Sequence, residues 1–227
     1  MNLKNKKHPK YNPDKWNKNI YIRKSHNCYA YALNILKPSY ANLCKKYLKK
    51  TKKHNCHGLR PQPGQFSGYI DEYKKHPYKC KKIERRMKKD NKYLKKIRKN
   101  QKCPDGYYKI ALVNDGEDYH FYRQDKIGLW SHKDGWRKAR NTDVKNRLIK
   151  DPKTAKRGKY KKFCGYYIVP NNRFQKKLSN KTRKYKNKIS KYQRILNITK
   201  NKKTKSKKTK SKKTKNKKTK NKNKNKK

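Results

Sequence analysis

Acidic residues are scarce in this chain of 227 residues. Asp and Glu together number 13, against 74 Lys and Arg, and Glu occurs only three times. No acid follows Asp151, although residues 171–227 hold 27 basic residues. Drift toward A/T-rich codons is an alternative source of the lysine, but Asp and Glu codons are also A/T-friendly, so drift does not explain the missing acids. The formal net charge of +61 therefore predicts a polyanionic partner.

Long apolar runs are also missing. No stretch approaches the ~20 residues that a membrane span needs. The first residues, Met-Asn-Leu-Lys-Asn-Lys-Lys, lack the apolar stretch of a secretory signal. The sequence thus predicts an intracellular, non-secreted protein with no membrane partner, with a virion or the nucleus as candidate locations. In such a reducing compartment we expect the six cysteines to be reactive, metal-bound or buried more often than bridged.

One cluster contains the residue types that bind zinc. Cys44, Cys56, His57, His76 and Cys80 lie within 37 residues, and zinc takes four Cys or His ligands. The cluster has no pair of Cys-x2-Cys knuckles, and its only tight spacing is between the last His and the last Cys. We therefore expect no metal and no cofactor, with a structural zinc as the weaker alternative.

The apolar pattern predicts an α+β fold. Residues 1–24 read as a basic N-terminal arm, and residues 25–170 as the core domain. A helical pattern runs from Cys28 to Leu36, and a thinner helical stripe covers residues 79–99. The expected strands are residues 107–113, 119–124, 129–132 and 163–169. The prediction is an N-terminal helix that carries Cys28 and packs on a small antiparallel sheet.

The composition changes after Pro170. Residues 171–198 place apolar side chains mostly three or four apart, which predicts a basic amphipathic helix. Residues 199–227 repeat Lys-Lys-Thr-Lys-Ser and Lys-Lys-Thr-Lys-Asn, with nothing apolar to offset chain entropy, so this tail is predicted to be disordered. Residues 171–227 are expected to bind nucleic acid or another polyanion without sequence specificity, because Lys is a flexible point charge.

Three residues form the candidate catalytic site. Cys28 opens a predicted helix, where the helix dipole favours a thiolate. His120 lies on a predicted strand and suits the role of base, and His132 on the next strand suits that of orienting group. A short turn between these strands brings residues 120 and 132 close to pairing across the ladder. Asp134 and Asn141 are alternative orienting residues.

This pattern resembles a known family. The motifs Asn-Cys-Tyr-Ala-Tyr-Ala-Leu at residues 27–33, Tyr-His-Phe-Tyr at 119–122 and Ser-His at 131–132 resemble the Cys–His–His arrangement of NlpC/P60 peptidases, within the papain-like group. The resemblance covers roughly residues 20–170. It implies Cys28 as nucleophile, His120 as base and His132 as orienting group. The chain departs from the family at its nucleophile motif, where Asn27-Cys28-Tyr29-Ala30 replaces Asp-Cys-Ser-Gly.

The resulting functional prediction is a cysteine hydrolase or acyltransferase. It would act on an amide, isopeptide or ester bond of a protein or peptide substrate. Its cationic tail would associate with nucleic acid. The alternative is a non-enzymatic polyanion-binding or virion-packing protein on an inactive hydrolase scaffold, since the lysine- and asparagine-rich style also resembles proteins of large DNA viruses.

Overall fold

A six-stranded antiparallel sheet forms the centre of the fold. A computed structural model describes residues 8–69 and 78–171, and the predicted helix at 171–198 and tail at 199–227 lie essentially outside them. The strands are β1 (Lys95–Ile97), β2 (Tyr107–Asn114), β3 (Tyr119–Gln124), β4 (Trp130–Lys133), β5 (Ala139–Arg140) and β6 (Lys162–Pro170). Their order across the sheet is β1-β6-β2-β3-β4-β5, and each neighbouring pair is antiparallel.

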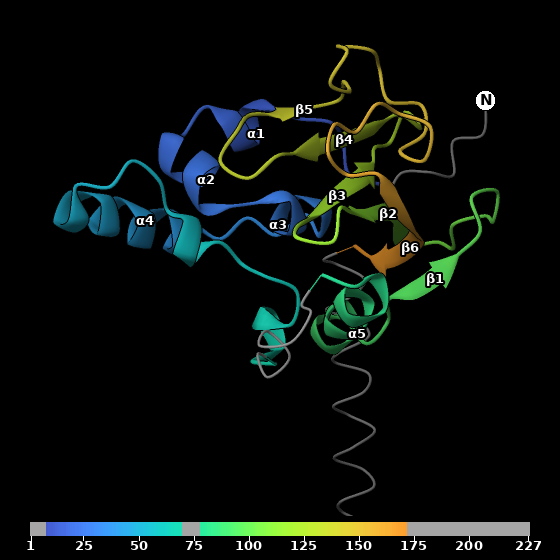
Figure 1. Ribbon diagram of the computed structural model, residues 1–227, viewed down its shortest axis with the longest axis horizontal. Coiled ribbons are helices and arrows are strands. Elements are labelled where there is room, and N and C mark those ends of the chain that lie inside the picture. The colour runs from blue at the N-terminus through green and yellow to red at the C-terminus, as the bar shows by residue number, and fades with distance from the viewer. Residues whose placement is uncertain (1–7, 70–77, 172–227) are drawn as a thin grey trace, which may run out of the picture. The chain divides into compact units, whose positions relative to one another are not determined.

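The helices precede the sheet in the sequence. They are α1 (Asp14–Asn17), α2 (Ile20–Ser25), α3 (Cys28–Ala32), α4 (Pro38–Thr51) and α5 (Cys80–Asp90), with short 3-10 turns η2 (His57–Leu59) and η3 (Gln65–Ser67). Figure 1 shows α3 and α5 beside the sheet, while α4 extends away from it. The α+β prediction is therefore confirmed. Among the described residues, none of the helices combines the length and apolar character that crossing a membrane requires.

Both faces of the sheet are buried, which explains the nearly continuous apolar sequence of β2. Ile110 and Leu112 face one cluster, which also contains residues of α3 and α5. Ala111 and Val113 face a second cluster, shared with Ile149 of the long connection between β5 and β6. This alternation follows from the two-residue period of a strand. The connection between residues 141 and 161 therefore covers the face opposite the helices.

Several boundaries differ from the sequence prediction. The helical stripe predicted over residues 79–99 ends at Asp90, and Ile97 belongs to edge strand β1. The helix predicted to reach Leu36 ends at Ala32. Within the predicted basic arm, α1 and α2 are ordered helices, and Trp16 is only 1% exposed because it packs edge-on against Tyr31. Burial of that indole ties the arm to the core.

Candidate functional site

The start of α3 is positioned by its cap. The side-chain oxygen of Asn27 accepts a hydrogen bond from Ala30 N at 3.2 Å, and its amide nitrogen donates to Pro61 O at 2.8 Å. Such a cap fixes the first turn of a helix. Cys28, the first residue of α3, is 5% exposed, and its Sγ lies 4.0 Å from Tyr119 O. The cap and the packing of α3 against β3 and β4 thus hold the thiol beside the start of β3.

The two histidines meet as a hydrogen-bonded pair. Nε2 of His120 lies 2.8 Å from Nδ1 of His132, and Nε2 of His132 lies 3.0 Å from Thr142 O. The ladder pairs His132 with Tyr122, so the two histidines are diagonal rather than directly opposite neighbours. Among the described residues, His132 is the hydrogen-bond partner of His120. The structure therefore brings His132, rather than Asp134 or Asn141, into contact with His120.

Cys28 and His120 line one cavity of about 300 Å³. Its walls come from the start of α3, from η2 and the segment after it, from the ends of the β2–β3 and β4–β5 turns, and from Tyr160. The ring of Tyr160 stacks on His120 with centroids 5.3 Å apart. Its hydroxyl donates to Asp118 at 2.8 Å. Two of the three predicted site residues, Cys28 and His120, therefore line one polar cavity, and His132 contacts it only through its hydrogen bond to His120. Their catalytic role stays a prediction.

Burial dominates the protonation of this cluster. It raises the pKa of the Cys28 thiol to about 12 and lowers the pKa of His132 to about 4. The pKa of His120 is held well below its usual value by burial and then by the neighbouring His132. The expectation that the helix start favours a thiolate is wrong here, because α3 has only five residues and desolvation outweighs its dipole. At neutral pH the thiol and both imidazoles are uncharged.

Lys133 is a buried residue behind the site that sequence analysis missed. It is fully buried, and its ammonium donates to the carbonyls of Arg23 at 2.6 Å, His26 at 2.6 Å and Gly135 at 2.7 Å. Burial lowers its pKa to about 7, with the Arg60 charge as a further cause. In a chain with 61 lysines no local pattern distinguishes this one. It fastens the end of α2 and the β4–β5 turn around the cavity.

Four of the six cysteines form disulfides, contrary to the expectation of reduced thiols. Cys44 of α4 is joined to Cys56, and Cys80 at the start of α5 is joined to Cys164 of β6. Three of the proposed zinc ligands are thereby removed, and His76 lies outside the described residues. In residues 8–69 and 78–171, no group of three or more His, Cys, Asp or Glu side chains is arranged to hold a metal ion.

The fold and site thus define a disulfide-linked, cationic α+β protein with a polar cavity and an uncharged thiol. Family models give no match to the chain, and no solved structure matches it. The chain is 35% identical over 165 residues to insoluble matrix shell protein 1 of Ruditapes philippinarum, covering 70% of this chain and 89% of that protein. The chain belongs to the family of this shell matrix protein.

This relationship corrects three predictions. The prediction of a cysteine hydrolase or acyltransferase is wrong, and so is its virion-packing alternative, because the relative is a protein of an insoluble shell matrix. The prediction of an intracellular, non-secreted protein in a virion or nucleus is wrong on the same ground, since a shell matrix is an extracellular material. The NlpC/P60 resemblance consequently carries no hydrolytic activity to this chain.

Proposed function

We propose that this protein is a structural component of an insoluble extracellular matrix. The observation that carries the proposal is the 35% identity to insoluble matrix shell protein 1, which extends over 89% of that protein. Similarity over nearly the whole of the relative supports a shared role better than a match to one short motif. The proposed role is non-catalytic: the chain contributes a stable, charged module to the matrix.

The two disulfides support an extracellular location. Disulfides form and persist in oxidising surroundings, and they are rare where thiols are kept reduced. The Cys80–Cys164 bond joins residues 84 apart in the sequence and connects α5 to the sheet. The Cys44–Cys56 bond fixes the middle of α4 to the segment that leads to the cavity. Both bonds would stabilise the folded chain in an extracellular material.

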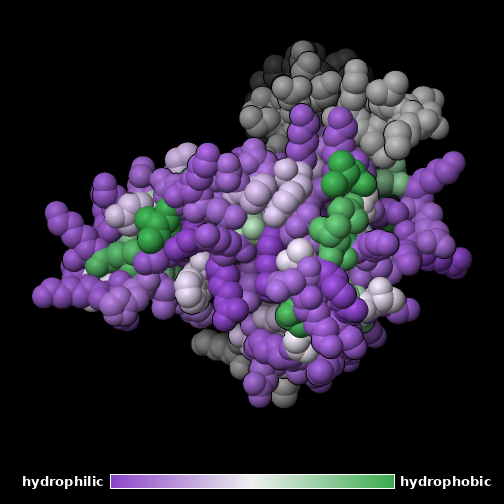
Figure 2. Space-filling view, turned by 90° about the horizontal axis from the view of Figure 1, so that it is seen from above, coloured by the Kyte–Doolittle hydropathy of each residue, from purple (hydrophilic) through white to green (hydrophobic). Residues whose placement is uncertain are grey.

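The charge supports an anionic partner within that matrix. Figure 2 shows a face on which hydrophilic residues predominate and hydrophobic ones form separate patches. With 74 basic and 13 acidic residues, the chain is suited to bind acidic macromolecules through many weak contacts, and residues 171–227 contribute 27 basic residues without an acid. We propose that this segment binds a polyanion without reading its sequence, by a salt-sensitive attraction.

We also propose a more specific description of the α+β fold. A papain-like arrangement, with a cysteine-bearing helix packed on an antiparallel sheet, is supported by the contacts of α3 with β3 and β4 and by the cavity shared by Cys28 and His120. This comparison concerns the arrangement of helix and sheet alone and implies no hydrolytic activity.

Fractionation of the source tissue tests the proposed function. An antibody against the chain is applied to the cytosolic, soluble extracellular and insoluble extracellular fractions. We expect the chain in the insoluble extracellular fraction, with its release requiring high salt. Recovery from the cytosol with all six thiols reduced would contradict the proposal.

Binding of a polyanion is tested on the full chain. Retention on a poly-aspartate resin is expected at 50 mM salt and should be largely lost at 300 mM. Replacing every Lys in residues 199–227 with Gln should weaken retention, whereas the matched Lys→Arg replacements should preserve it. Equal retention of the Gln and Arg variants would show that residues 199–227 are not the part of the chain that binds the resin.

A further inference from the structure

The cavity beside Cys28 continues into a second hollow at the surface. This hollow, about 320 Å³, shares Arg60, Asp118 and Asp134 with the first and adds the half-exposed Trp136. The two form one groove, walled by the segment after η2 and by the β2–β3 and β4–β5 turns. The two hollows thus share a wall that contains Arg60.

Arg60 is an incompletely paired charge in the wall of the groove. The residue is 7% exposed, and its Nε donates to Lys24 O at 3.0 Å. Its NH2 nitrogen is buried and has no hydrogen-bond partner, and among the described residues no carboxylate lies within ion-pair distance of its guanidinium, on which the Asp134 charge acts from farther away. An arginine stays charged in proteins, and a buried charge without a counterion is costly. The guanidinium in the wall of the groove thus has a hydrogen-bond donor that no described residue uses, and it has no counterion in direct contact.

The acidic residues of the groove are engaged elsewhere. Asp134 Oδ2 lies 3.8 Å from Arg137 Nε. Asp118 accepts from Tyr160 OH at 2.8 Å and lies 3.3 Å from Lys159 Nζ. These two carboxylates disfavour a multiply charged anion such as phosphate or sulfate in the same groove. They favour a single negative charge that is accompanied by N–H donors, which is the chemistry of an acidic residue within a peptide.

We propose that this groove binds one carboxylate-bearing residue of a partner polypeptide, with the Arg60 guanidinium receiving the carboxylate. The guanidinium fork matches the two oxygens of a carboxylate. The cavity volume suits one side chain with its flanking peptide groups, whose N–H groups would donate to the lone pairs of Asp118 and Asp134 that their present partners leave unused. This proposal is independent of the proposed matrix function, because a small soluble ligand with one acidic residue is enough to fill the site.

The test uses a monomeric probe, so that binding through many lysines cannot imitate it. N-acetyl-L-aspartate N-methylamide is titrated into the full, disulfide-bonded chain in 150 mM salt and followed by amide and Arg Nε–H chemical shifts. We expect saturable shifts concentrated on Gly58, Arg60 and Gly135, and at least tenfold weaker binding of the matched asparagine compound. Equal binding of the two compounds, or shifts spread over surface lysines, would overturn the proposal.

Substitutions separate Arg60 from general charge. Arg60→Gln is expected to weaken binding of the aspartate compound at least tenfold, whereas Arg98→Gln, the same charge change at an exposed residue outside the groove, should change it less than twofold. Arg60→Lys keeps the charge but loses the fork, and should bind several-fold more weakly than the native chain. Equal effects at Arg60 and Arg98 would overturn the proposal. If neither Arg60 variant folds, the shift map of the native chain decides.

Discussion

Nε2 of His120 and Nδ1 of His132 lie 2.8 Å apart and are buried between the neighbouring interior strands β3 and β4. Only one of these two nitrogens carries a hydrogen in the neutral pair, so one ring donates and the other accepts. If Nε2 of His132 donates to Thr142 O, its Nδ1 is the acceptor for His120, whereas if Nε2 accepts from Arg140 Nε at 3.3 Å, its Nδ1 is the donor. Adding a proton to the pair would place a second donor in this contact and a charge in a dry environment.

The buried histidines predict that the protein loses stability in acid. Burial lowers the pKa of both His26 and His132 to about 4. The histidines of the unfolded chain bind a proton near pH 6.5. Above that pH, the free energy of unfolding should therefore have its full value. It should fall as pH decreases toward 4, by on the order of 3 kcal/mol for each histidine. Urea unfolding at pH 7.5, 5.5 and 4.5, followed by tryptophan fluorescence, measures this.

A matched pair of variants serves as control for the acid prediction. His132→Gln should reduce the slope of stability against pH between 6.5 and 4, whereas His54→Gln, at an exposed position, should leave it unchanged. A native chain whose unfolding free energy stays constant from pH 7.5 to 4.5 would show that these histidines are not buried in their neutral form.

Cys28 should be slow to alkylate in the folded protein. A pKa near 12 leaves roughly a thousandth of the thiolate that an ordinary cysteine has at neutral pH. We expect iodoacetamide to label Cys28 at least a hundredfold more slowly in buffer than in 6 M urea, as read by peptide mass spectrometry. The half-buried Cys103 is the internal reference. Labelling of Cys28 ahead of Cys103 in the native state would instead indicate an activated thiol.

The two disulfides should differ in their contribution to stability. A bond across 84 residues constrains the unfolded chain more than one across 12. From loop entropy we expect losses of about 4.5 kcal/mol for the Cys80→Ser/Cys164→Ser variant and about 3 kcal/mol for Cys44→Ser/Cys56→Ser. Denaturant unfolding of both variants against the native chain measures the difference. Equal losses, or a larger loss for the shorter loop, would refute the ranking.

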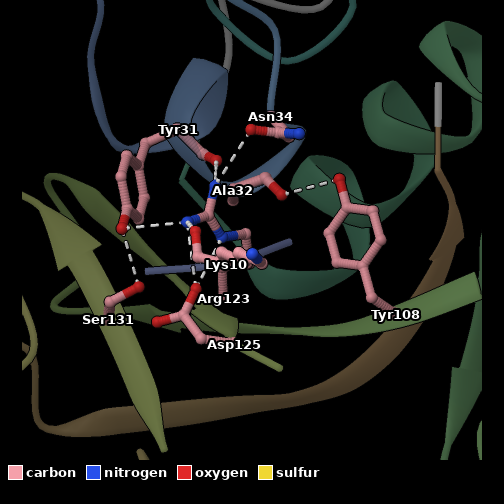
Figure 3. Close-up of polar contacts among 8 residues, drawn as sticks. All are labelled: Lys10, Tyr31, Ala32, Asn34, Tyr108, Arg123, Asp125 and Ser131. Atoms are coloured by element: carbon pink, nitrogen blue, oxygen red, sulfur yellow. Dashed lines mark hydrogen bonds and ion pairs between the residues drawn. The ribbon is translucent and has the colours of Figure 1, made fainter. Parts of the chain in front are cut away.

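Arg123 should be the most sensitive buried charge. Figure 3 shows its guanidinium between Asp125, Tyr31 and Asn34, and the nearest carboxylate oxygen of Asp125 lies 3.0 Å away. Both members of the ion pair are 1% exposed. Arg123→Met should cost about 3–5 kcal/mol of unfolding free energy, because it leaves the Asp125 carboxylate buried without its partner.

Two further variants identify the cause of that loss. Arg123→Met/Asp125→Leu should recover part of the lost stability, since no buried carboxylate then remains unpaired. Arg137→Met, at an exposed ion pair, should cost less than about 1 kcal/mol. All three are compared by urea unfolding. No recovery in the double variant would assign the loss to packing around Tyr31 rather than to charge.

The fold was largely readable from local patterns. Strands β2, β3, β4 and β6 and the helix at Cys28 follow from apolar runs and turn residues. Edge strands β1 and β5, of three and two residues, were missed because such short segments carry almost no periodic signal. Helix α4 was not among the predicted elements, because its buried residues are few, Ala41 and Cys44 among them. Its position depends on contacts with α2 and a disulfide, which sequence spacing does not show.

The candidate site was predictable in part. The order of Cys28, His120 and His132 along helix and strands indicated their proximity, which the pairing of β3 and β4 accounts for. Their protonation was not predictable, because desolvation depends on how completely the surrounding chain covers them. Lys133 and Arg60 were also beyond reach. Lys133 is defined by the carbonyls to which it donates, and Arg60 by the cavity that it lines, and segments distant in the sequence contribute both. Basic residues are common throughout this chain, so neither stands out in the sequence.

The position of β6 between β1 and β2 has a consequence for biosynthesis. This strand is the last of the six to leave the ribosome, yet it lies inside the sheet and pairs with a neighbour on each side. Until residue 170 has been translated, β1 lacks its pairing partner and one side of β2 exposes unpaired backbone groups. A nascent chain that stalls before Lys162 would therefore present an open strand edge to neighbouring nascent chains, which makes completion of translation a precondition for safe folding.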